Sequence, residues 1–557
     1  MVQRARLRRH RRVWIGLILL AAIYGAVIVP RAAKDDFLVF HRAGRAVLEG
    51  RSPYQDPYYL YPPVVAYAFA PLALVPPLAA SALWYALSLG ALVAIAVLSV
   101  EAATGSMMAP ASRYVLPLVA SSRLWTNNLE HGQTNLILAA LLMFAFRARR
   151  LGGPARAGAL VAVAGTIKLF PYASLLYFET RRGARTVLLS ALAITALLWA
   201  LPSLRAEIGN TSDIAAFRAR TLDRFAPGQV VQPGTWNQSL AAMVARVAPA
   251  SAKEWEVGGA TALVQAMVVA LLLVVLWRSR SRGPSGDGDR TLDFAAFAAC
   301  LAAMPLVSGL SWKAHFTMLL PGWFALLAPE SWEGRVSART SRWVRAAALG
   351  TGLALVFTAD GLVGKRVAEA FQSGSGFALA GLAVFGLLVV LAVLGRVGPN
   401  RLAAGLKRVW ALLLMSLLLP VIFSPWGHIL FAVGPLRVTE AGLHEGAIFT
   451  ARILLLFFAT ALLAQTTPPA EVAKGLERLL APLRVFGVRP GWLARSMALS
   501  WAYFPVFWQN VRQMVKSGGN RHGWFDRAVH LPGDIVADLY LLAAATAAAP
   551  SAESREK

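Results

Sequence analysis

The 557-residue chain has a single cysteine and few charged residues, and both shortages narrow the class of protein. Cys300 alone excludes an intramolecular disulfide and any metal site built from several thiolates. Charged residues make up 15% of the chain, whereas soluble domains carry about 25%. Because 57% of the residues are hydrophobic, much of the surface is expected to face lipid rather than water.

Acidic residues are scarce relative to basic ones, with 28 Asp and Glu against 55 Lys and Arg, which gives a net charge of +27. A charge of this sign also occurs in proteins that bind nucleic acid. Here, however, the basic residues form short clusters between apolar runs, such as Arg4–Arg12, Arg147–Arg156 and Arg335–Arg345. Membrane proteins carry such clusters in their cytoplasmic loops, where the cations contact anionic lipid headgroups. We therefore expect a membrane as a partner and no nucleic acid.

Phosphate-loop and metal motifs are also missing. The chain has no glycine-rich phosphate loop and no His-x-x-x-His pair. An Asp-x-Asp motif, Asp287–Asp289, falls in a Gly/Ser-rich basic stretch that is expected to be a solvated linker. The sequence therefore supports no nucleotide-sugar donor, no divalent metal and no other cofactor.

Long apolar runs are abundant, and a helix needs about 20 mostly apolar residues to cross a bilayer. The candidate spans are Val13–Val29, Ala79–Val100, Leu136–Phe146, Ala157–Phe178, Thr186–Leu201, Ala260–Trp277, Phe294–Leu306, His315–Leu327, Val344–Phe357 and Phe377–Leu394. Tyr61–Leu78 and Tyr114–Leu124 are weaker, because proline or polar residues interrupt them. The pattern predicts an all-α polytopic protein of a bacterial inner (plasma) membrane, with Arg4–Arg12 and the N-terminus in the cytoplasm.

A basic stretch with Pro and Gly, Arg396–Arg408, separates the last of these spans from the rest of the chain. We place the domain boundary there. Residues 1–395 are predicted to form the larger transmembrane domain, residues 396–408 a basic linker, and residues 409–557 a smaller helical membrane module.

Two carboxylates, Asp35 and Asp36, follow the first predicted span, near the boundary between lipid and water. One interpretation is a solvated acidic pair that caps a helix. The other is a general base that takes a proton from a hydroxyl group. A carboxylate at that depth can meet a lipid-borne substrate whose phosphate lies among the headgroups, so both interpretations stay open.

Cationic side chains lie in or beside the apolar runs. Lys168 falls inside the predicted span Ala157–Phe178, where a charge is costly and is expected to face a cavity or a partner. Near a helix end it would instead reach the headgroups. His315, with Lys313 close by, begins another predicted span. All three are candidates for binding phosphate, and the alternative for His315 is an interfacial ring bonded to the backbone.

Amide side chains gather just before two further apolar stretches. Gln133 and Asn135 stand at the start of the predicted span Leu136–Phe146, and Asn237 and Gln238 precede a weaker stretch. Amides in such places hydrogen-bond the hydroxyl groups of a substrate, or they cap the helices that follow.

Six short segments lie near the ends of predicted spans, and their order along the chain is informative. They are Asp36–Tyr54, Tyr61–Pro63, Gly132–Asn135, Ile167–Pro171, Trp236–Leu240 and Ser311–Phe316. Together they resemble glycosyltransferase family 87, over about residues 10–395. That family includes polyprenyl-phosphate-mannose-dependent α-mannosyltransferases with a GT-C fold. The resemblance implies transfer of a hexose, mannose in the first place, from a polyprenyl-phosphate sugar to a lipid or glycan acceptor on the external face.

The same resemblance implies roles for single residues. Asp36 matches the first-loop Asp that is thought to be the family's base, and Asp35 is the reserve candidate. The implied reaction is an inverting single displacement, in which the acceptor hydroxyl attacks the anomeric carbon and polyprenyl phosphate leaves. Tyr61 joins the binding residues through its motif. The family often has two adjacent His residues where this chain has Ala314 and His315, so only the second position is kept.

The C-terminal third resembles a different family. A Thr-rich turn at Gln465–Val472, an amphipathic stretch at Val472–Val488 and Trp501–Pro505 are similar to the CbiQ/EcfT transmembrane component of energy-coupling-factor transporters, over about residues 405–525. That family couples to ABC-type ATPases through Ala-Arg-Gly-type motifs, which Lys516–Gly523 does not keep. The resemblance implies an ABC-type ATPase as a partner. Two alternative functions stay open: a transporter component, or a catalytically silent membrane scaffold.

Overall fold

The computed structural model describes most of residues 19–394 and short stretches after them. The gaps before residue 394 are 20, 201, 203–209, 224–233, 250, 280–289, 329–331 and 333–335. Beyond it, the described residues are 410, 412–419, 421–422, 429–433, 436–439, 442, 446, 450, 453 and 477. The chain packs as two compact units, Met1–Gly398 and Pro399–Lys557, and each is described by itself.

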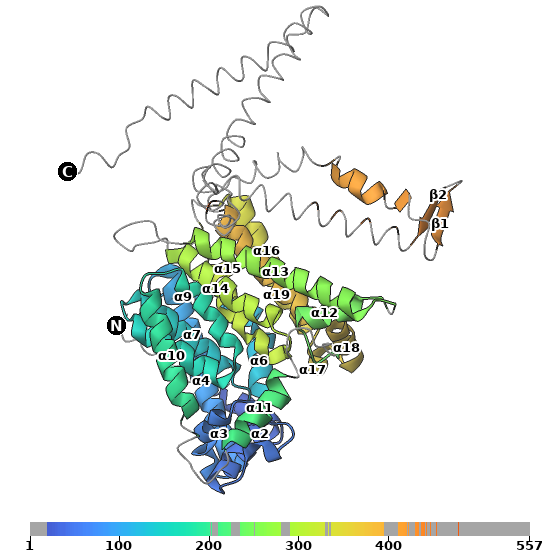
Figure 1. The fold of residues 1–557 in the computed structure, drawn as a ribbon. Coiled ribbons are helices and arrows are strands. Elements are labelled where there is room, and N and C mark those ends of the chain that lie inside the picture. Colours follow the sequence, from blue (N-terminus) through green and yellow to red (C-terminus); the bar gives the residue numbers. More distant parts are fainter. Residues whose placement is uncertain are drawn as a thin grey trace, which may run out of the picture. The chain divides into compact units, whose positions relative to one another are not determined.

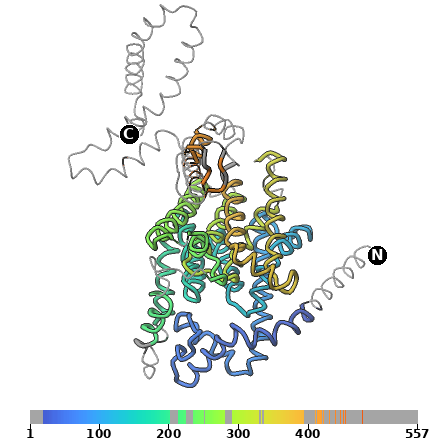
Figure 2. The backbone as a smooth tube through the Cα atoms, turned by 90° about the vertical axis from the view of Figure 1, so that its right-hand side faces the viewer, coloured from blue at the N-terminus to red at the C-terminus, as the bar shows by residue number. Residues whose placement is uncertain are grey.

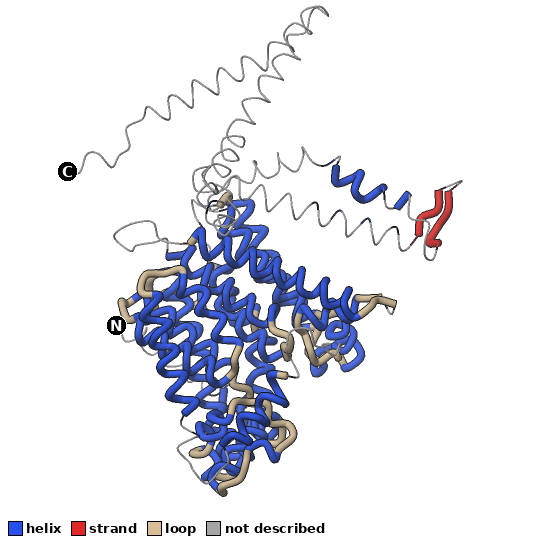
Figure 3. The backbone as a smooth tube through the Cα atoms, in the orientation of Figure 1, coloured by secondary structure: helices blue, strands red, loops and turns tan. Residues whose placement is uncertain are grey.

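The first unit is built of helices (Figures 1 and 3). After a first apolar helix, Ala21–Ala32, its α-helices are α2 (Asp36–Leu48), α3 (Pro63–Phe69), α4 (Pro77–Thr104), α5 (Ser112–Ala120), α6 (Ser122–Glu130), α7 (Asn135–Arg150), α8 (Pro154–Ile167), α9 (Leu175–Glu179), α10 (Ala184–Ala200), α11 (Asn210–Phe217), α12 (Leu240–Val247), α13 (Glu254–Arg278), α14 (Arg290–Val307), α15 (Leu320–Leu327), α16 (Ala338–Val356), α17 (Asp360–Val363), α18 (Lys365–Ser373) and α19 (Gly376–Leu394). Short 3-10 turns are η1 (Pro53–Gln55), η2 (Leu72–Leu74), η3 (Phe170–Ser174) and η6 (Lys313–Leu319), and η5 (Arg218–Leu222) is a π-helical turn.

Among the described residues, three helices are long and apolar enough to cross a membrane: α4, α13 and α14. The pair α18 and α19, bent by 57°, adds a fourth span if it crosses as one. The most apolar stretch of α14 is 83% buried, whereas that of α13 is 22% buried, so α14 lies in the core and α13 at the periphery. The all-α polytopic membrane fold predicted from the sequence is thereby confirmed.

One predicted span, Ala157–Phe178, is wrong as a single helix. Helix α8 ends at Ile167, and Lys168 follows in extended backbone with φ −141° and ψ 143°. The chain then continues through η3 and the short helix α9. Pro171 explains part of the break, because proline lacks the N–H that would continue the helical ladder. Lys168 therefore caps a helix end instead of lying within a helix.

The stretch between the first helix and α3, which the sequence analysis treated as a long loop, is folded as α2 and η1. Its aromatic side chains form a buried cluster with Phe69 and Trp84. The clustered rings from the stretch are Phe37, Phe40, Tyr54, Tyr59 and Tyr61, whereas Tyr58 is 73% exposed. Both views show α2 and α3 at one end of the helix bundle, and α11 contacts α3 and η1 there (Figures 1 and 2). The buried aromatic cluster thus supports α2, at whose start Asp35 and Asp36 lie.

The second unit contributes a helix that includes Leu412–Leu419 and an antiparallel hairpin of β1 (Ile429–Val433) and β2 (Leu436–Thr439). Ser416 and Thr450 share a hydrogen bond of 2.9 Å between their hydroxyl groups. The motifs predicted at Gln465–Val472, Trp501–Pro505 and Lys516–Gly523 lie outside the described residues. The boundaries predicted at 395 and 409 stay a prediction.

Candidate active site

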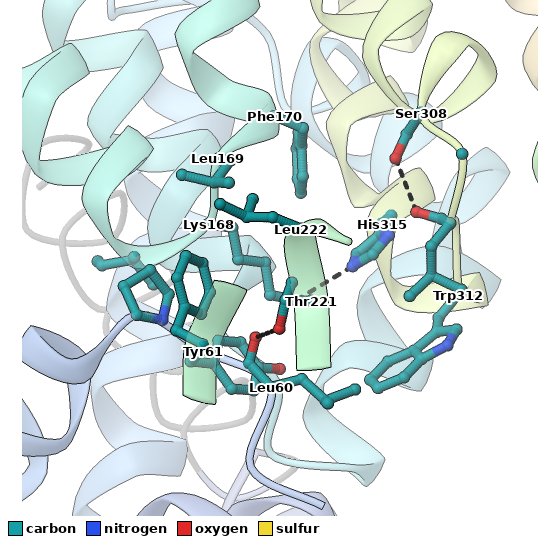
Figure 4. A pocket seen from close by; sticks show the side chains of 15 residues that line it. Leu60, Tyr61, Lys168, Leu169, Phe170, Thr221, Leu222, Ser308, Trp312 and His315 are labelled. Atoms are coloured by element: carbon teal, nitrogen blue, oxygen red, sulfur yellow. Dashed lines mark hydrogen bonds between the residues drawn. The ribbon is translucent and has the colours of Figure 1, made fainter. Parts of the chain in front are cut away.

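A cavity of about 360 Å³ lies in the first unit, where the ends of α8 and α14 meet the start of α3 (Figure 4). Its lining residues are Leu60, Tyr61, Pro62, Ile167, Lys168, Leu169, Phe170, Phe217, Thr221, Leu222, Ser308, Gly309, Leu310, Trp312 and His315. Most of these side chains are apolar, while Lys168 carries an ammonium group and His315 an imidazole. A mostly apolar cavity with a few polar groups is typical of a ligand site.

The Lys168 side chain is buried, and its hydrogen-bond partners among the described residues are neutral groups. Its Nζ donates to Gln133 Oε1 at 3.2 Å, to Asn135 Oδ1 at 3.0 Å and to His315 Nε2 at 3.2 Å. The residue is 8% exposed, and its Nζ lies 5.3 Å from the centre of the Tyr61 ring. We call Lys168 with these three bonded partners the lysine centre. A charge buried among neutral groups is costly, so an anion in the cavity would stabilise the charged form of Lys168.

The imidazole of His315 lies between two aromatic rings (Figure 4). The Phe170 ring is 5.1 Å away, centre to centre, and the Trp312 ring is 6.1 Å away at an angle of 12°. His315 belongs to the 3-10 turn η6, which packs against α6 and α7. These contacts hold the ring at the wall of the cavity, with Nε2 toward Lys168.

Gln133 links the cavity to the carboxylates. Its Nε2 donates to Asp36 Oδ2 at 2.5 Å, and its Oε1 accepts from Lys168 and, at 3.4 Å, from the Tyr61 hydroxyl. The turn before it requires Gly132, which has φ +62° and whose missing Cβ would stand 2.6 Å from Phe37 Cβ. This close approach allows α2 to pack against the turn that carries Gln133. The hydrogen bonds then form a continuous chain from Asp36 through Gln133 and Lys168 to His315.

The carboxylates lie at the other end of that chain. Asp35 is the N-cap of α2, accepts from the Asp36 N–H at 2.9 Å, and accepts from His131 Nδ1 at 2.6 Å. Side-chain ligand atoms of Asp35, Asp36 and His131 all lie within 4.8 Å of one another, and we call these three residues the carboxylate group. Helix capping thus holds for Asp35, while Asp36 faces Gln133.

The pKa values of the carboxylate group follow from these contacts. The hydrogen bond from His131 lowers the pKa of Asp35, and the same bond raises the pKa of His131. Burial raises the pKa of Asp36, although the bond from Gln133 and the charges of His131 and Lys168 act in the opposite direction. Asp36 is therefore the more basic of the two carboxylates, as a proton acceptor must be.

Asn237 and Gln238 do not line the cavity. Asn237 Oδ1 accepts from the backbone N–H of Ser239 and of Ser311, each at 3.1 Å, and its Nδ2 donates to the carbonyl of Gly309 at 3.2 Å. Gln238 Nε2 donates to the carbonyl of Gln372 at 2.8 Å. These amides hold the 309–311 turn, whose Gly309 and Leu310 form cavity wall. Their predicted contact with substrate stays a prediction.

Lys313 also lies away from the lining residues, although it begins the same 3-10 turn as His315. Burial lowers the pKa of Lys313, the charge of Arg123 on α6 lowers it further, and no described side chain hydrogen-bonds Lys313. The two candidate cations of η6 therefore face different surroundings, and only His315 reaches the cavity.

Sequence reasoning missed several residues at this site. Trp312 and Phe170 stood inside quoted motifs without a role, and Phe217, Thr221 and Leu222 come from a polar stretch that carried no motif. Thr221 is held in place by a 2.9 Å bond from its hydroxyl to the carbonyl of Leu60 (Figure 4). That segment reaches the cavity because α11 and η5 pack at the end of the bundle that holds the aromatic cluster. No sequence motif indicates this packing.

The fold and the site define a multi-pass membrane protein with a mostly apolar cavity that a buried lysine and a histidine line. Two known protein families match parts of the chain. Residues 59–309 match the model of glycosyltransferase family 87, and residues 375–530 match that of the cobalt transport protein CbiQ. The predicted two-part resemblance is thereby confirmed. The first match contains Tyr61, Gln133 and Lys168, but it begins after Asp36 and ends before His315.

A relative of the first part is the polyprenol-phosphate-mannose-dependent alpha-(1-2)-phosphatidylinositol mannoside mannosyltransferase of Mycolicibacterium smegmatis. It is 27% identical over 342 residues, which are 56% of this chain and 71% of that protein. This relative and the family match together support glycosyltransferase activity. No solved structure is significantly similar to the chain.

Relatives of the second part are named energy-coupling factor transporter transmembrane protein EcfT. The protein of Listeria innocua is 35% identical over 113 residues, which are 20% of this chain and 43% of that protein. The protein of Leuconostoc gelidum is 32% identical over 117 residues, which are 21% of this chain and 44% of that protein. The chain spans about half the length of the EcfT relatives that it matches.

Proposed function

We propose that the first unit transfers a hexose, mannose in the first place, from a polyprenyl-phosphate sugar to a lipid or glycan acceptor. The observation that carries this proposal is the chain of hydrogen bonds from Asp36 through Gln133 to Lys168 and His315. It connects a base at one end to a cationic cavity at the other. The family match and the mannosyltransferase relative favour the same chemistry.

The cavity suits a donor that is both anionic and lipid-borne. Lys168 is buried and its three N–H groups bond neutral acceptors, so an anion that approaches it would replace one of these acceptors in a charge-assisted bond. Apolar lining residues such as Leu169, Leu222 and Leu310 suit an isoprenoid chain. A phosphate held by Lys168 and His315 would place the sugar toward the side of Tyr61 and Gln133.

The proposed reaction is a single displacement with inversion. Asp36 takes the proton of the acceptor hydroxyl, and that oxygen attacks the anomeric carbon. The bond between the anomeric carbon and the phosphate oxygen breaks, and polyprenyl phosphate leaves with the electron pair. Lys168 and His315 stabilise the negative charge on the departing phosphate. Asp35 is the reserve base, but its ion pair with His131 makes it the weaker acceptor.

Replacement of the proposed base tests this function. In proteoliposomes supplied with radiolabelled polyprenyl-phosphate mannose, Asp36→Asn is expected to lower transfer by about 10²–10⁴-fold, the usual contribution of general-base catalysis. Glu49→Gln is a matched control, because Glu49 lies at the other end of α2 and pairs with Arg45 and Arg51 at the surface. Transfer by Asp36→Asn at the rate of the unmodified protein would reject the proposal.

A second candidate function comes from the second unit. The match to CbiQ and the EcfT relatives favour an association with an ABC-type ATPase, as part of a transporter. Copurification of such an ATPase with the full chain, lost when residues after 399 are removed, would support this function. An inactive scaffold is the outcome if neither sugar transfer nor ATPase binding is found. A bacterial inner membrane with a cytoplasmic N-terminus remains the proposed location, which cysteine-accessibility labelling of each terminus tests.

A further inference from the structure

His131 is the member of the carboxylate group to which the proposed reaction gives no task. It ends helix α6, where its backbone N–H bonds the carbonyl of Asn127 at 3.3 Å. Its ring turns toward α2, and Nδ1 donates to Asp35 Oδ2 at 2.6 Å. The cap therefore uses the backbone of His131, while its side chain bonds Asp35 and lies within 4.8 Å of the Asp36 carboxylate.

The charges around Asp36 come from several elements. They are Asp35 before α2, His131 and Glu130 at the end of α6, and Lys168 after α8, with the Tyr61 hydroxyl also near. Asp35 opposes a negative charge on Asp36, and burial opposes it as well. The terminal amide of Gln133 lies between Lys168 and Asp36, because its Nε2 bonds Asp36 and its Oε1 bonds Lys168. His131, when protonated, is thus a cation within 4.8 Å of both carboxylates, and it bonds Asp35 with no side chain between them.

We propose that His131 is a positioning residue: held by Asp35, its imidazolium keeps Asp36 ionised and ready to accept the acceptor's proton. This inference rests on the proposed function, because it assumes that Asp36 is the base. Asp35 then has a task as well. It fixes the ring through a 2.6 Å bond and raises the pKa of His131, so that the ring stays protonated over a wider range of pH.

A divalent cation is the competing occupant of this place. Asp35, Asp36 and His131 offer one ligand atom each within 4.8 Å, and two carboxylates with an imidazole suit several metals. A metal would replace the proton on His131 Nδ1, since a coordinating nitrogen must be deprotonated. The two occupants therefore predict opposite responses to chelation.

The test is the pH dependence of kcat/KM for sugar transfer, because its acid limb reports the ionisation of the base in the free enzyme. His131→Gln keeps a donor toward Asp35 but removes the positive charge. Its acid limb is expected to shift to higher pH, with a several-fold loss on that limb and little change on the plateau. His131→Lys restores a positive charge and is expected to move the limb back toward its original position.

Three results would overturn or separate the claims. If His131→Gln has the pH profile of the unmodified protein while Asp36→Asn is inactive, the inference fails and the proposed function stands. If Asp36→Asn transfers sugar at the rate of the unmodified protein, the proposed function is rejected. The inference is then rejected with it, because it assumes that Asp36 is the base. If a chelator abolishes transfer by the unmodified protein and Mn²⁺ restores it, a metal and not a proton occupies the group, and the inference is rejected.

Discussion

The carboxylate group and the lysine centre are two polar regions joined by one side chain, and they balance charge in different ways. In the carboxylate group, the ion pair of Asp35 and His131 is partly exposed, with side-chain exposures of 45% and 41%. In the lysine centre, the buried Lys168 ammonium hydrogen-bonds, within the described part of the chain, the neutral groups of Gln133, Asn135 and His315. The charge of Asp35 is thus paired directly with His131, whereas the hydrogen-bond partners of Lys168 carry no charge, so that an anion in the cavity would stabilise its ammonium group. That difference is why we propose the lysine centre as the place of the donor phosphate.

Among the changes to these two regions, removal of the Lys168 ammonium group should lower sugar transfer the most. Lys168→Met keeps the length of the side chain and removes its charge. Loss of one preorganised group that stabilises developing charge costs about 10²–10³-fold in rate. The same loss should appear in the affinity for polyprenyl phosphate itself, which isothermal calorimetry in detergent measures.

A matched control for that variant is Lys365→Met. The Lys365 side chain is 84% exposed on α18 and pairs only loosely, at 3.9 Å, with Glu369. Its removal should leave both transfer and phosphate affinity unchanged. Equal losses in the two lysine variants would show that total charge, and not the buried position of Lys168, governs donor binding.

Loss of the Gln133 hydrogen bonds that join the two regions should lower sugar transfer by an intermediate amount. Gln133→Leu removes the donor to Asp36 and an acceptor of Lys168. Hydrogen bonds to charged groups contribute about 1.5–3 kcal/mol each, so a loss of transfer of about tenfold or more is expected. Gln133→Glu places a second carboxylate beside Asp36, and it should shift the acid limb to higher pH. Unchanged transfer by the Leu variant would show that the regions act independently.

The smallest effect on chemistry is expected at Asn237, which supports the cavity wall from behind. Asn237→Ala leaves the N–H groups of Ser239 and Ser311 without their acceptor. Buried groups left unpaired cost about 1–3 kcal/mol, so the thermal midpoint should fall while transfer changes only a few-fold. A loss of transfer as large as that of Lys168→Met, with an unchanged midpoint, would instead favour direct contact with the sugar.

The helix α19 shows where two kinds of boundary disagree. The match to CbiQ begins at residue 375, so it includes α19. In the structure, α19 packs on α14 and α16 and belongs to the first unit. Sequence similarity follows descent, whereas packing follows which apolar faces are covered. The ancestry of a helix therefore does not decide which core it joins.

Much of the site could be predicted from motifs, because polar residues at the ends of apolar runs are costly unless they have a task. Lys168, His315, Gln133 and Asp36 were found in that way, and the structure joins them in one network. Asn237 and Gln238 carried the same signal, yet they bond the backbone of a neighbouring turn. A motif shows that a side chain is constrained, but the constraint can be a ligand or a piece of backbone.

The sequence by itself determined that the chain is helical and lies in a membrane, because apolar runs must cover their backbone in lipid. It also determined the order of the two family regions. Only the tertiary structure decided that Lys168 stands at a helix end, that Gln133 joins it to Asp36, and that His131 adjoins both carboxylates. Those facts depend on close approaches between distant segments, such as Gly132 against Phe37, and no local pattern encodes which segments will meet.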